Sequence, residues 1–198
     1  MLSEKIEHTK DRIQRALCLY QPAEPEVQAS SWPAAVLILL YEHQSRIHLV
    51  LQKRTETVEA HKGQISFPGG GREKADPDLV FTALRETHEE IGVRPEDVEV
   101  LGQLDGLNTI SGFSVIPFVG WLQVYPYEWV CSDHEVAYLL EVPLDHLSDP
   151  ANYMVDRRLH RGAISEFPSF RFEGDLIWGA TARMVQNFLD VVEVARST

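Results

Sequence analysis

A continuous apolar run is the feature that most constrains the fold of this 198-residue chain. Residues 34–41 read AAVLILLY and contain no charged residue that would mark a solvent-facing side. A strand that is apolar on both faces is typical of the centre of a covered sheet. After a turn near residues 43–45, the segment 47–54 has the pattern of a second strand, and we expect the two strands to form a hairpin.

The rest of the chain alternates irregularly between strand and helix patterns. These patterns predict an amphipathic helix at 3–19, a polar loop at 55–63, strands at 98–104 and 114–124, a short helix that follows residues 133–144 and ends near 149–150, a strand at 170–178 and a helix at 180–195. The irregular order favours an α/β fold with a mixed sheet over a doubly wound parallel fold. Because we find no repeat and no linker, we expect one domain over residues 1–198, with an N-terminal helix at about 3–19 and a core at about 32–198.

Composition excludes some classes of function. The formal net charge is −12, from 30 acidic and 18 basic residues, which disfavours nucleic-acid binding through phosphate contacts. No apolar run approaches the roughly 20 residues of a membrane span, and the first residues carry no secretory signal. The two cysteines, Cys18 and Cys131, form no disulfide framework and are expected to be buried thiols. We therefore expect a cytoplasmic protein that binds neither membranes nor nucleic acid.

Three carboxylates are spaced to share one face of a helix. Glu86, Glu89 and Glu90 fall at i, i+3 and i+4, within a single helical turn. Like charges at this spacing destabilise a helix by roughly 0.2–0.5 kcal/mol per pair, so the cluster needs a compensating partner. Solvent is one candidate, and a hard divalent cation such as Mg²⁺ is another.

The acidic segment has the end signals of a helix over residues 77–91. Pro77 suits the first helical position, Asp76 is the expected N-cap, and Gly92 is the expected C-terminal stop. Directly before this helix, Gly69, Gly70 and Gly71 lack the spacing of a P-loop. They fit a tight strand-to-helix turn, in which a backbone carbonyl such as that of Gly70 could also complete a metal shell.

The spacing of these residues resembles the signature G-x5-E-x7-R-E-U-x-E-E-x-G-U of the Nudix hydrolases, in which U is apolar. The matching positions are Gly71, Arg85, Glu86, Glu89, Glu90, Gly92 and Val93. The sequence departs from the signature at Pro77, which stands at the first glutamate, and at Thr87, which stands at the first U. The resemblance implies a Nudix fold, in which a mixed β-sheet is sandwiched between α-helices.

The preceding residues, His61-Lys62-Gly63-Gln64-Ile65-Ser66-Phe67-Pro68-Gly69-Gly70, are similar to a second motif in the coenzyme A diphosphatase branch of that superfamily. An aspartate at the offset of Asp76 is also typical of that branch. The resemblance implies that substrate contacts come from His61, Lys62, Gln64 and Phe67. Lys62, with Lys53, Arg54 and Arg72, could also meet the phosphates of coenzyme A.

The resemblance also implies roles for the acidic helix. Glu86 and Glu90 would hold Mg²⁺ or Mn²⁺, with Gly70 and Glu89 as further ligands, although Glu89 could instead position or deprotonate the attacking water. Arg85 would orient a carboxylate. Glu135 is the first candidate for a general base, although an exposed helix-capping residue is an alternative interpretation. Glu166 and Glu173 are weaker candidates.

The implied reaction is hydrolysis of coenzyme A, or of an acyl or oxidised derivative, to 3′,5′-ADP and a 4′-phosphopantetheine product. One alternative keeps this chemistry with ADP-ribose, NADH or a nucleoside triphosphate as substrate. A second alternative, prompted by Pro77, is a non-catalytic ligand-binding protein of the same fold. A homodimer is possible, since dimers are common in this superfamily.

Overall fold

The computed structural model of the chain describes residues 2–26, 31–56, 63–160 and 163–194. The helices are α1 (Leu2–Leu19), α2 (Leu79–Ile91), α3 (Leu144–Ser148) and α4 (Gly179–Val194), with short 3-10 turns at Pro95–Asp97 and Pro150–Asn152. The strands are β1 (Trp32–His43), β2 (Arg46–Arg54), β3 (Ile65–Ser66), β4 (Gly69–Gly71), β5 (Val98–Gln103), β6 (Leu107–Asn108), β7 (Phe113–Leu122), β8 (Val136–Pro143), β9 (Tyr153–His160), β10 (Ala163–Phe172) and β11 (Asp175–Ile177).

The main sheet is mixed, as predicted. β1 runs parallel to β7 and antiparallel to β2, which confirms the expected hairpin. β5 and β8 extend the sheet on either side by antiparallel pairing with β7 and β2. The short strands β3, β4 and β6 pair with β2, β1 and β7 at the end of the sheet where the glycine-rich segment lies.

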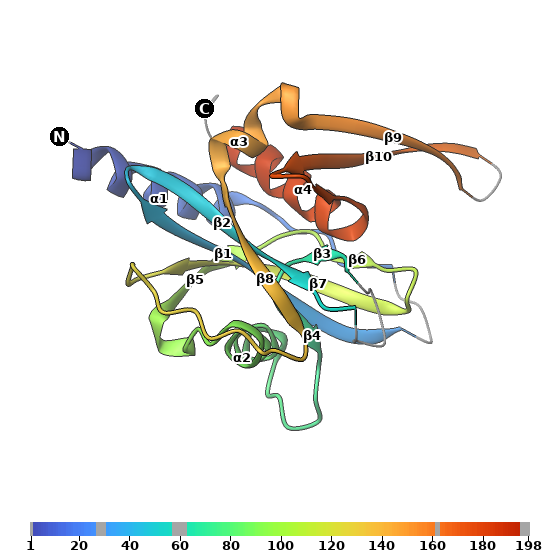
Figure 1. Ribbon diagram of the computed structural model, residues 1–198, viewed down its shortest axis with the longest axis horizontal. Coiled ribbons are helices and arrows are strands. Elements are labelled where there is room, and N and C mark those ends of the chain that lie inside the picture. Colours follow the sequence, from blue (N-terminus) through green and yellow to red (C-terminus); the bar gives the residue numbers. More distant parts are fainter. Residues whose placement is uncertain (1, 27–30, 57–62, 161–162, 195–198) are drawn as a thin grey trace.

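The side chains of β1 alternate between two apolar cores, one on each face of the sheet. Ile38 and Leu40 belong to the core that α1 and α4 cover, whereas Leu37 and Leu39 belong to the core beneath α2. Figure 1 shows α2 on one side of the sheet and both long terminal helices on the other. This arrangement explains the unbroken apolar run, because both faces of β1 are covered along residues 34–41.

A second, three-stranded sheet with the order β11-β10-β9 lies beside α4 (Figure 1). The prediction of one strand at 170–178 is wrong, because a turn at Glu173 and Gly174 separates β10 from β11. Both residues have positive φ, 50° and 94°, which reverses the chain within two residues. The antiparallel pair β9–β10 was not predicted.

The structure also bears on three smaller expectations, which concern the cysteines, the polar loop and membrane spans. Cys18 is exposed and Cys131 is only half-buried, so the cysteines are not the buried thiols expected. Residues 57–62, most of the predicted polar loop, lie outside the described residues. Within the described ranges, no helix combines the length and apolar character needed to cross a bilayer.

Candidate metal-dependent hydrolase site

The glycine-rich segment is a strand of the main sheet, not only the tight turn expected. Gly69, Gly70 and Gly71 pair with Val36, Ala35 and Ala34 of β1. At Gly69 φ is 148°, and a Cβ atom there would overlap the carbonyl oxygen of Ala35. The absence of a side chain therefore allows β4 to lie close to β1. The pairing of the two strands fixes the start of the loop that leads into α2.

The helix begins two residues later than predicted. Its N-cap is Asp78, whose side chain accepts a hydrogen bond from the backbone N–H of Phe81, and its first residue is Leu79. Asp76 is therefore not the cap, and Pro77 is not the first helical residue. Two aspartates flank Pro77, and both suit a cap, so local signals did not separate them.

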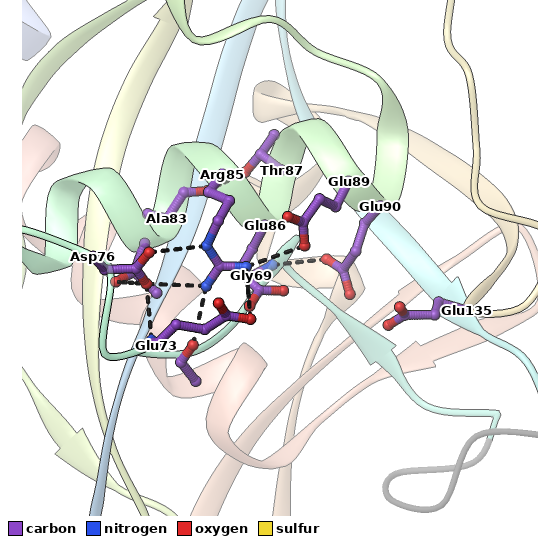
Figure 2. A network of polar contacts seen from close by, with 12 residues as sticks. Gly69, Glu73, Asp76, Ala83, Arg85, Glu86, Thr87, Glu89, Glu90 and Glu135 are labelled. Atoms are coloured by element: carbon purple, nitrogen blue, oxygen red, sulfur yellow. Dashed lines mark hydrogen bonds and ion pairs between the residues drawn. The ribbon is translucent and has the colours of Figure 1, made fainter.

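Asp76 instead makes a buried ion pair with Arg85 (Figure 2). Arg85 donates from Nε and Nη2 to the two carboxylate oxygens of Asp76 at 3.1 and 3.0 Å. The same carboxylate accepts hydrogen bonds from the backbone N–H of Glu73 and the hydroxyl of Thr82. The Arg85 guanidinium, together with these donors, holds the pKa of Asp76 well below its usual range.

Arg85 also contacts the acidic face of α2. Its Nη1 lies 2.9 Å from Oε1 of Glu86 and 3.1 Å from Oε2 of Glu89, and its Nη2 donates to the carbonyl of Gly71. One guanidinium thus joins the loop, the glycine strand and two helix carboxylates. This geometry suits a residue that orients carboxylates, and its part in catalysis stays a prediction.

Glu90 is the most buried of the helix carboxylates, with a side chain that is 2% exposed. Its Oε2 accepts a hydrogen bond from the N–H of Gly69 at 2.8 Å, and its Oε1 accepts one from Nη1 of Arg54 at 3.1 Å. Burial raises the pKa of Glu90 to about 7, and the neighbouring Glu86 adds to the increase. Two hydrogen bonds therefore hold the Glu90 carboxylate in place, but they do not fully offset the cost of burying its charged form.

Glu86 lies directly over Gly70. A Cβ atom on Gly70 would come within 2.6 Å of Oε2 of Glu86, so only glycine leaves room for this carboxylate. Burial raises the pKa of Glu86, and the charges of Glu89 and Glu135 raise it further. Four carboxylates thus repel one another across this small area.

A loop from a distant part of the sequence brings Glu135 to the helix. The backbone N–H groups of Val130 and Ser132 donate to the carbonyls of Ile91 and Glu90, which lack partners within α2. The Glu135 carboxylate then lies 3.7 Å from Nη2 of Arg54, and Figure 2 shows it facing the acidic end of α2.

The two weaker candidates for a general base lie elsewhere. Glu166 pairs with Arg157 across β9 and β10, and Glu173 lies in the turn before β11.

The predicted substrate contacts are only partly brought to the site. Phe67 is 1% exposed and packs in the core between the sheet and α4, so the prediction that its ring faces a substrate is wrong. Gln64 lies next to β3, and its carbonyl accepts a hydrogen bond from the N–H of Arg54. His61 and Lys62 lie outside the described residues.

Three predicted cations already have protein partners. Arg54 lies between Glu90 and Glu135, and Arg72 donates to the carbonyls of Asp76 and Pro77. Lys53 forms an ion pair with Asp175 of the second sheet. Of these, only Arg54 contacts the predicted carboxylates, so it is the cation best placed to reach a diphosphate bound there.

One polar residue beside the carboxylates was not singled out from the sequence. Gln52 of β2 is 0% exposed and faces Glu90, whose pKa it lowers. The sequence held only a weak signal, since Gln52 alternates with His48, Val50 and Arg54 on a face of β2 that is mostly polar in sequence.

The donor chemistry of the site fits a hard divalent cation. The side chains available are carboxylates, which Mg²⁺ and Mn²⁺ prefer, and their mutual repulsion would be relieved by a positive charge. In the described part of the chain, no three His, Cys, Asp or Glu side chains converge closely enough to hold an ion as they stand. An ion would therefore compete with Arg85 for Glu86 and Glu89.

Comparison with known proteins agrees with the motif. A family model described as the NUDIX domain matches residues 31–152, which include β1, β4 and α2. Two curated relatives are each described as an uncharacterized Nudix hydrolase NudL. That of Pectobacterium atrosepticum is 36% identical over 155 residues, or 77% of this chain and 78% of the relative. That of Yersinia enterocolitica is 36% identical over 179 residues, or 89% of each.

Solved structures show the same fold at low sequence identity. A MutT/nudix family protein from Enterococcus faecalis matches with a TM-score of 0.55 and 14% identity, over 96% of this chain and 74% of that protein. A NUDIX hydrolase from Alicyclobacillus acidocaldarius matches with a TM-score of 0.51 and 17% identity, over 87% of this chain and 98% of that protein.

Proposed function

Because the chain belongs to the Nudix hydrolase family, we propose that it hydrolyses the diphosphate of coenzyme A or of an acyl or oxidised derivative. Water adds to one phosphorus of the diphosphate, and the bond from that phosphorus to the bridging oxygen breaks. With coenzyme A the products are 3′,5′-ADP and 4′-phosphopantetheine.

The observation that carries the hydrolytic proposal is the gathering of Glu86, which lies over Gly70, with Glu90 and Glu135, which both contact Arg54. Glu86 and Glu90 would hold the ion, Glu89 would complete the set after leaving Arg85, and the carbonyl of Gly70 is the backbone ligand we propose. A bound Mg²⁺ or Mn²⁺ supplies charge neutralisation on phosphate oxygens and a more acidic water.

The chain's own residues would orient the ligands and accept the proton. Asp76 fixes Arg85, and Arg85 fixes Glu86 at 2.9 Å, so the loop and the helix hold one carboxylate jointly. Glu135 is our first choice for the group that accepts a proton from the attacking water, with Glu89 as the second. Glu135 has its side chain 47% exposed, which leaves it open to a water molecule.

The choice of coenzyme A as substrate rests on the motif at residues 61–70. Arg54 would contribute charge at the diphosphate itself, while His61, Lys62 and Gln64 belong to the segment that would meet the rest of the substrate. Arg72 is exposed and would contribute a second positive charge at the start of the loop. We propose that the whole chain, residues 1–198, acts as one domain with a small-molecule nucleotide substrate.

Product analysis tests this proposal. The protein is incubated with coenzyme A and separately with ADP-ribose, each with Mg²⁺, with Mn²⁺ and with chelator. Glu90→Gln is the test variant, because it preserves shape while it removes the charge. Glu96→Gln, at an exposed residue of the 3-10 turn after α2, is the matched control.

Release of 3′,5′-ADP that depends on metal, and that Glu90→Gln loses but Glu96→Gln keeps, would support the proposal. Turnover of ADP-ribose alone would keep the chemistry and reject the coenzyme A assignment. If neither substrate reacts, other nucleotide substrates such as NADH or nucleoside triphosphates are tried next. Failure with all of them would favour a ligand-binding protein.

A further inference from the structure

The face of β2 that looks toward α2 contains a buried amide, that of Gln52. Gln52 is 0% exposed, and neither its Nε2 nor its Oε1 makes a hydrogen bond of normal geometry to a described residue. A buried polar group without a partner costs roughly 1–3 kcal/mol. Val50, two residues earlier on the same face, is also 0% exposed, so an apolar side chain is accommodated on this face.

Two further polar atoms beside Gln52 are also buried without a hydrogen bond to a described residue. Ser66 of β3 is its register partner, and the Ser66 hydroxyl is buried without a hydrogen bond among the described residues. Nε of Arg54, two residues further along the same face, is likewise buried and unpaired within the described part of the chain. Native structures keep few such groups, and here three of them adjoin one another.

Arg54 contacts Glu90 directly, and Gln52 and Ser66 adjoin Arg54 on the same face of the sheet. Arg54 reaches Glu90 through its Nη1 at 3.1 Å, and Gln52 lies two residues before Arg54 on the same face of β2. Glu90 is held from its other side by the N–H of Gly69. Gln52 and Arg54 therefore form the wall of β2 against which this carboxylate rests, and Ser66 of β3 lies beside Gln52.

We propose that Gln52 is a positioning residue that orients the carboxylate of Glu90 toward a bound divalent cation. This inference rests on the metal site of the proposed function and not on the identity of the substrate. An amide N–H that donates to a ligating carboxylate fixes its orientation, and loss of such an outer partner typically weakens metal binding about 10–100-fold. Burial of the Gln52 amide lowers the stability of the protein, and its function is to support metal binding.

Two measurements on one variant, Tm in chelator and Mn²⁺ affinity, separate a positioning role of Gln52 from a structural role. Gln52→Met removes the amide and nearly preserves the volume, so in chelator its Tm should equal or exceed that of the wild type. Its Mn²⁺ affinity, measured by calorimetric titration of the metal-free protein, should fall about 10–100-fold. The matched control Gln123→Met, at an exposed residue after β7, should change neither quantity.

A double-mutant cycle keeps the inference testable if the variant is destabilised. Since Gln52 acts through Glu90, adding Gln52→Met to Glu90→Gln should cause no further loss of Mn²⁺ affinity. A lower Tm with unchanged Mn²⁺ affinity would overturn the inference, and so would additive losses in the double variant.

These outcomes are distinct from failure of the proposed function. A wild type that binds Mn²⁺ but cleaves no coenzyme A rejects only the substrate assignment, and the Gln52 test still stands. A wild type that binds no Mn²⁺ rejects the metal site, and the role of Gln52 with it.

Discussion

Asp76 and Arg85 face each other as a two-point ion pair, with both carboxylate oxygens of Asp76 bonded to the same guanidinium. The pair joins the loop after β4 to the middle of α2. The Asp76 side chain is 1% exposed, so its charge depends on Arg85 and on the neighbouring donors for stabilisation. The same guanidinium reaches Glu86 and Glu89, which links the loop to the carboxylates.

Asp76→Asn should disturb the carboxylates without touching them. Loss of the charge frees Arg85 to shift toward Glu86 and Glu89, so we expect metal-dependent activity to fall roughly 10–100-fold and Tm to fall as well. Asp78→Asn is the control, because asparagine caps a helix as well as aspartate does. Equal losses in the two variants would show that the effect comes from the helix start and not from Arg85.

The ion pair also predicts how stability responds to acid. The folded-state pKa of Asp76 is depressed, so its stabilising effect is present above the unfolded value near 3.8 and is lost as the pH falls. Chemical unfolding of the wild type between pH 5 and pH 3 should show this loss. Asp76→Asn should show a smaller dependence on pH over that range, and an unchanged dependence would contradict the assignment.

Adjacent glycines should respond to alanine in different ways. In Gly70→Ala, the three atoms nearest the new Cβ belong to the Glu86 carboxylate, a side-chain end that can turn away from Arg85, so we expect nearly unchanged Tm and at least a tenfold loss of activity. In Gly69→Ala, the new Cβ meets the backbone of β1 at φ 148°, so we expect a clearly lower Tm. Gly112→Ala, with no atom near its Cβ, controls for strain at positive φ alone. A Gly70→Ala protein with full activity would reject the placement of Glu86 as a ligand.

The metal-free protein should become less stable as the pH rises toward neutrality. Burial raises the folded-state pKa of Glu90 from 4.5 to about 7, so its favourable effect is complete below pH 4.5 and is lost as the pH rises to about 7. The difference corresponds to about 3 kcal/mol in the free energy of unfolding.

Glu90→Gln isolates this contribution from other titrating groups. At pH 8 in chelator, we expect the variant to unfold at higher urea concentration than the wild type. Saturating Mn²⁺ should reverse the order, since only the wild type gains full stabilisation from the ion. A wild type more stable than the variant in chelator at pH 8 would contradict the raised pKa.

Phe67 should matter for stability and not for substrate affinity. Its side chain is 1% exposed in the core, so Phe67→Ala should lower the free energy of unfolding by about 3–5 kcal/mol. Phe67→Leu should lose less, and its KM should match that of the wild type. A raised KM in a Phe67→Leu protein of normal stability would support the original prediction that Phe67 contacts the substrate.

Sequence patterns predicted the elements whose signals are local and strong. The apolar run of β1 and the spacing of Glu86 and Glu90 required only strand and helix periodicity. The prediction of Asp76 as the helix cap was wrong, because Asp78 satisfies the same local preference and only the charge of Arg85 separates the two residues. The position of the cap thus depends on the contact between Asp76 and Arg85, which forms only when the loop packs against α2.

Two other features depended on long-range contacts. β9 and β10 were missed because their pairing joins segments of mixed polarity, and Phe170 of β10 is buried in the core with α4. Phe67 was assigned to the substrate because a motif records which residue is present but not the direction of its side chain. The alternation from Ile65 to Phe67 was the available clue, since both residues face the core that Ser66 avoids.

The contacts of the acidic site span very different lengths of chain, which has a consequence during protein synthesis. Asp76 and Arg85 are nine residues apart and Gly69 and Glu90 are 21 apart, whereas Thr55 and His134, whose hydrogen bond anchors the loop of Glu135, are 79 apart. Short loops lose less entropy on closure, and they close earlier as a chain leaves the ribosome. The glycine strand and α2 can therefore associate while the segment that carries Glu135 has yet to be translated. A nascent chain would then hold the carboxylates of α2 before it holds Glu135.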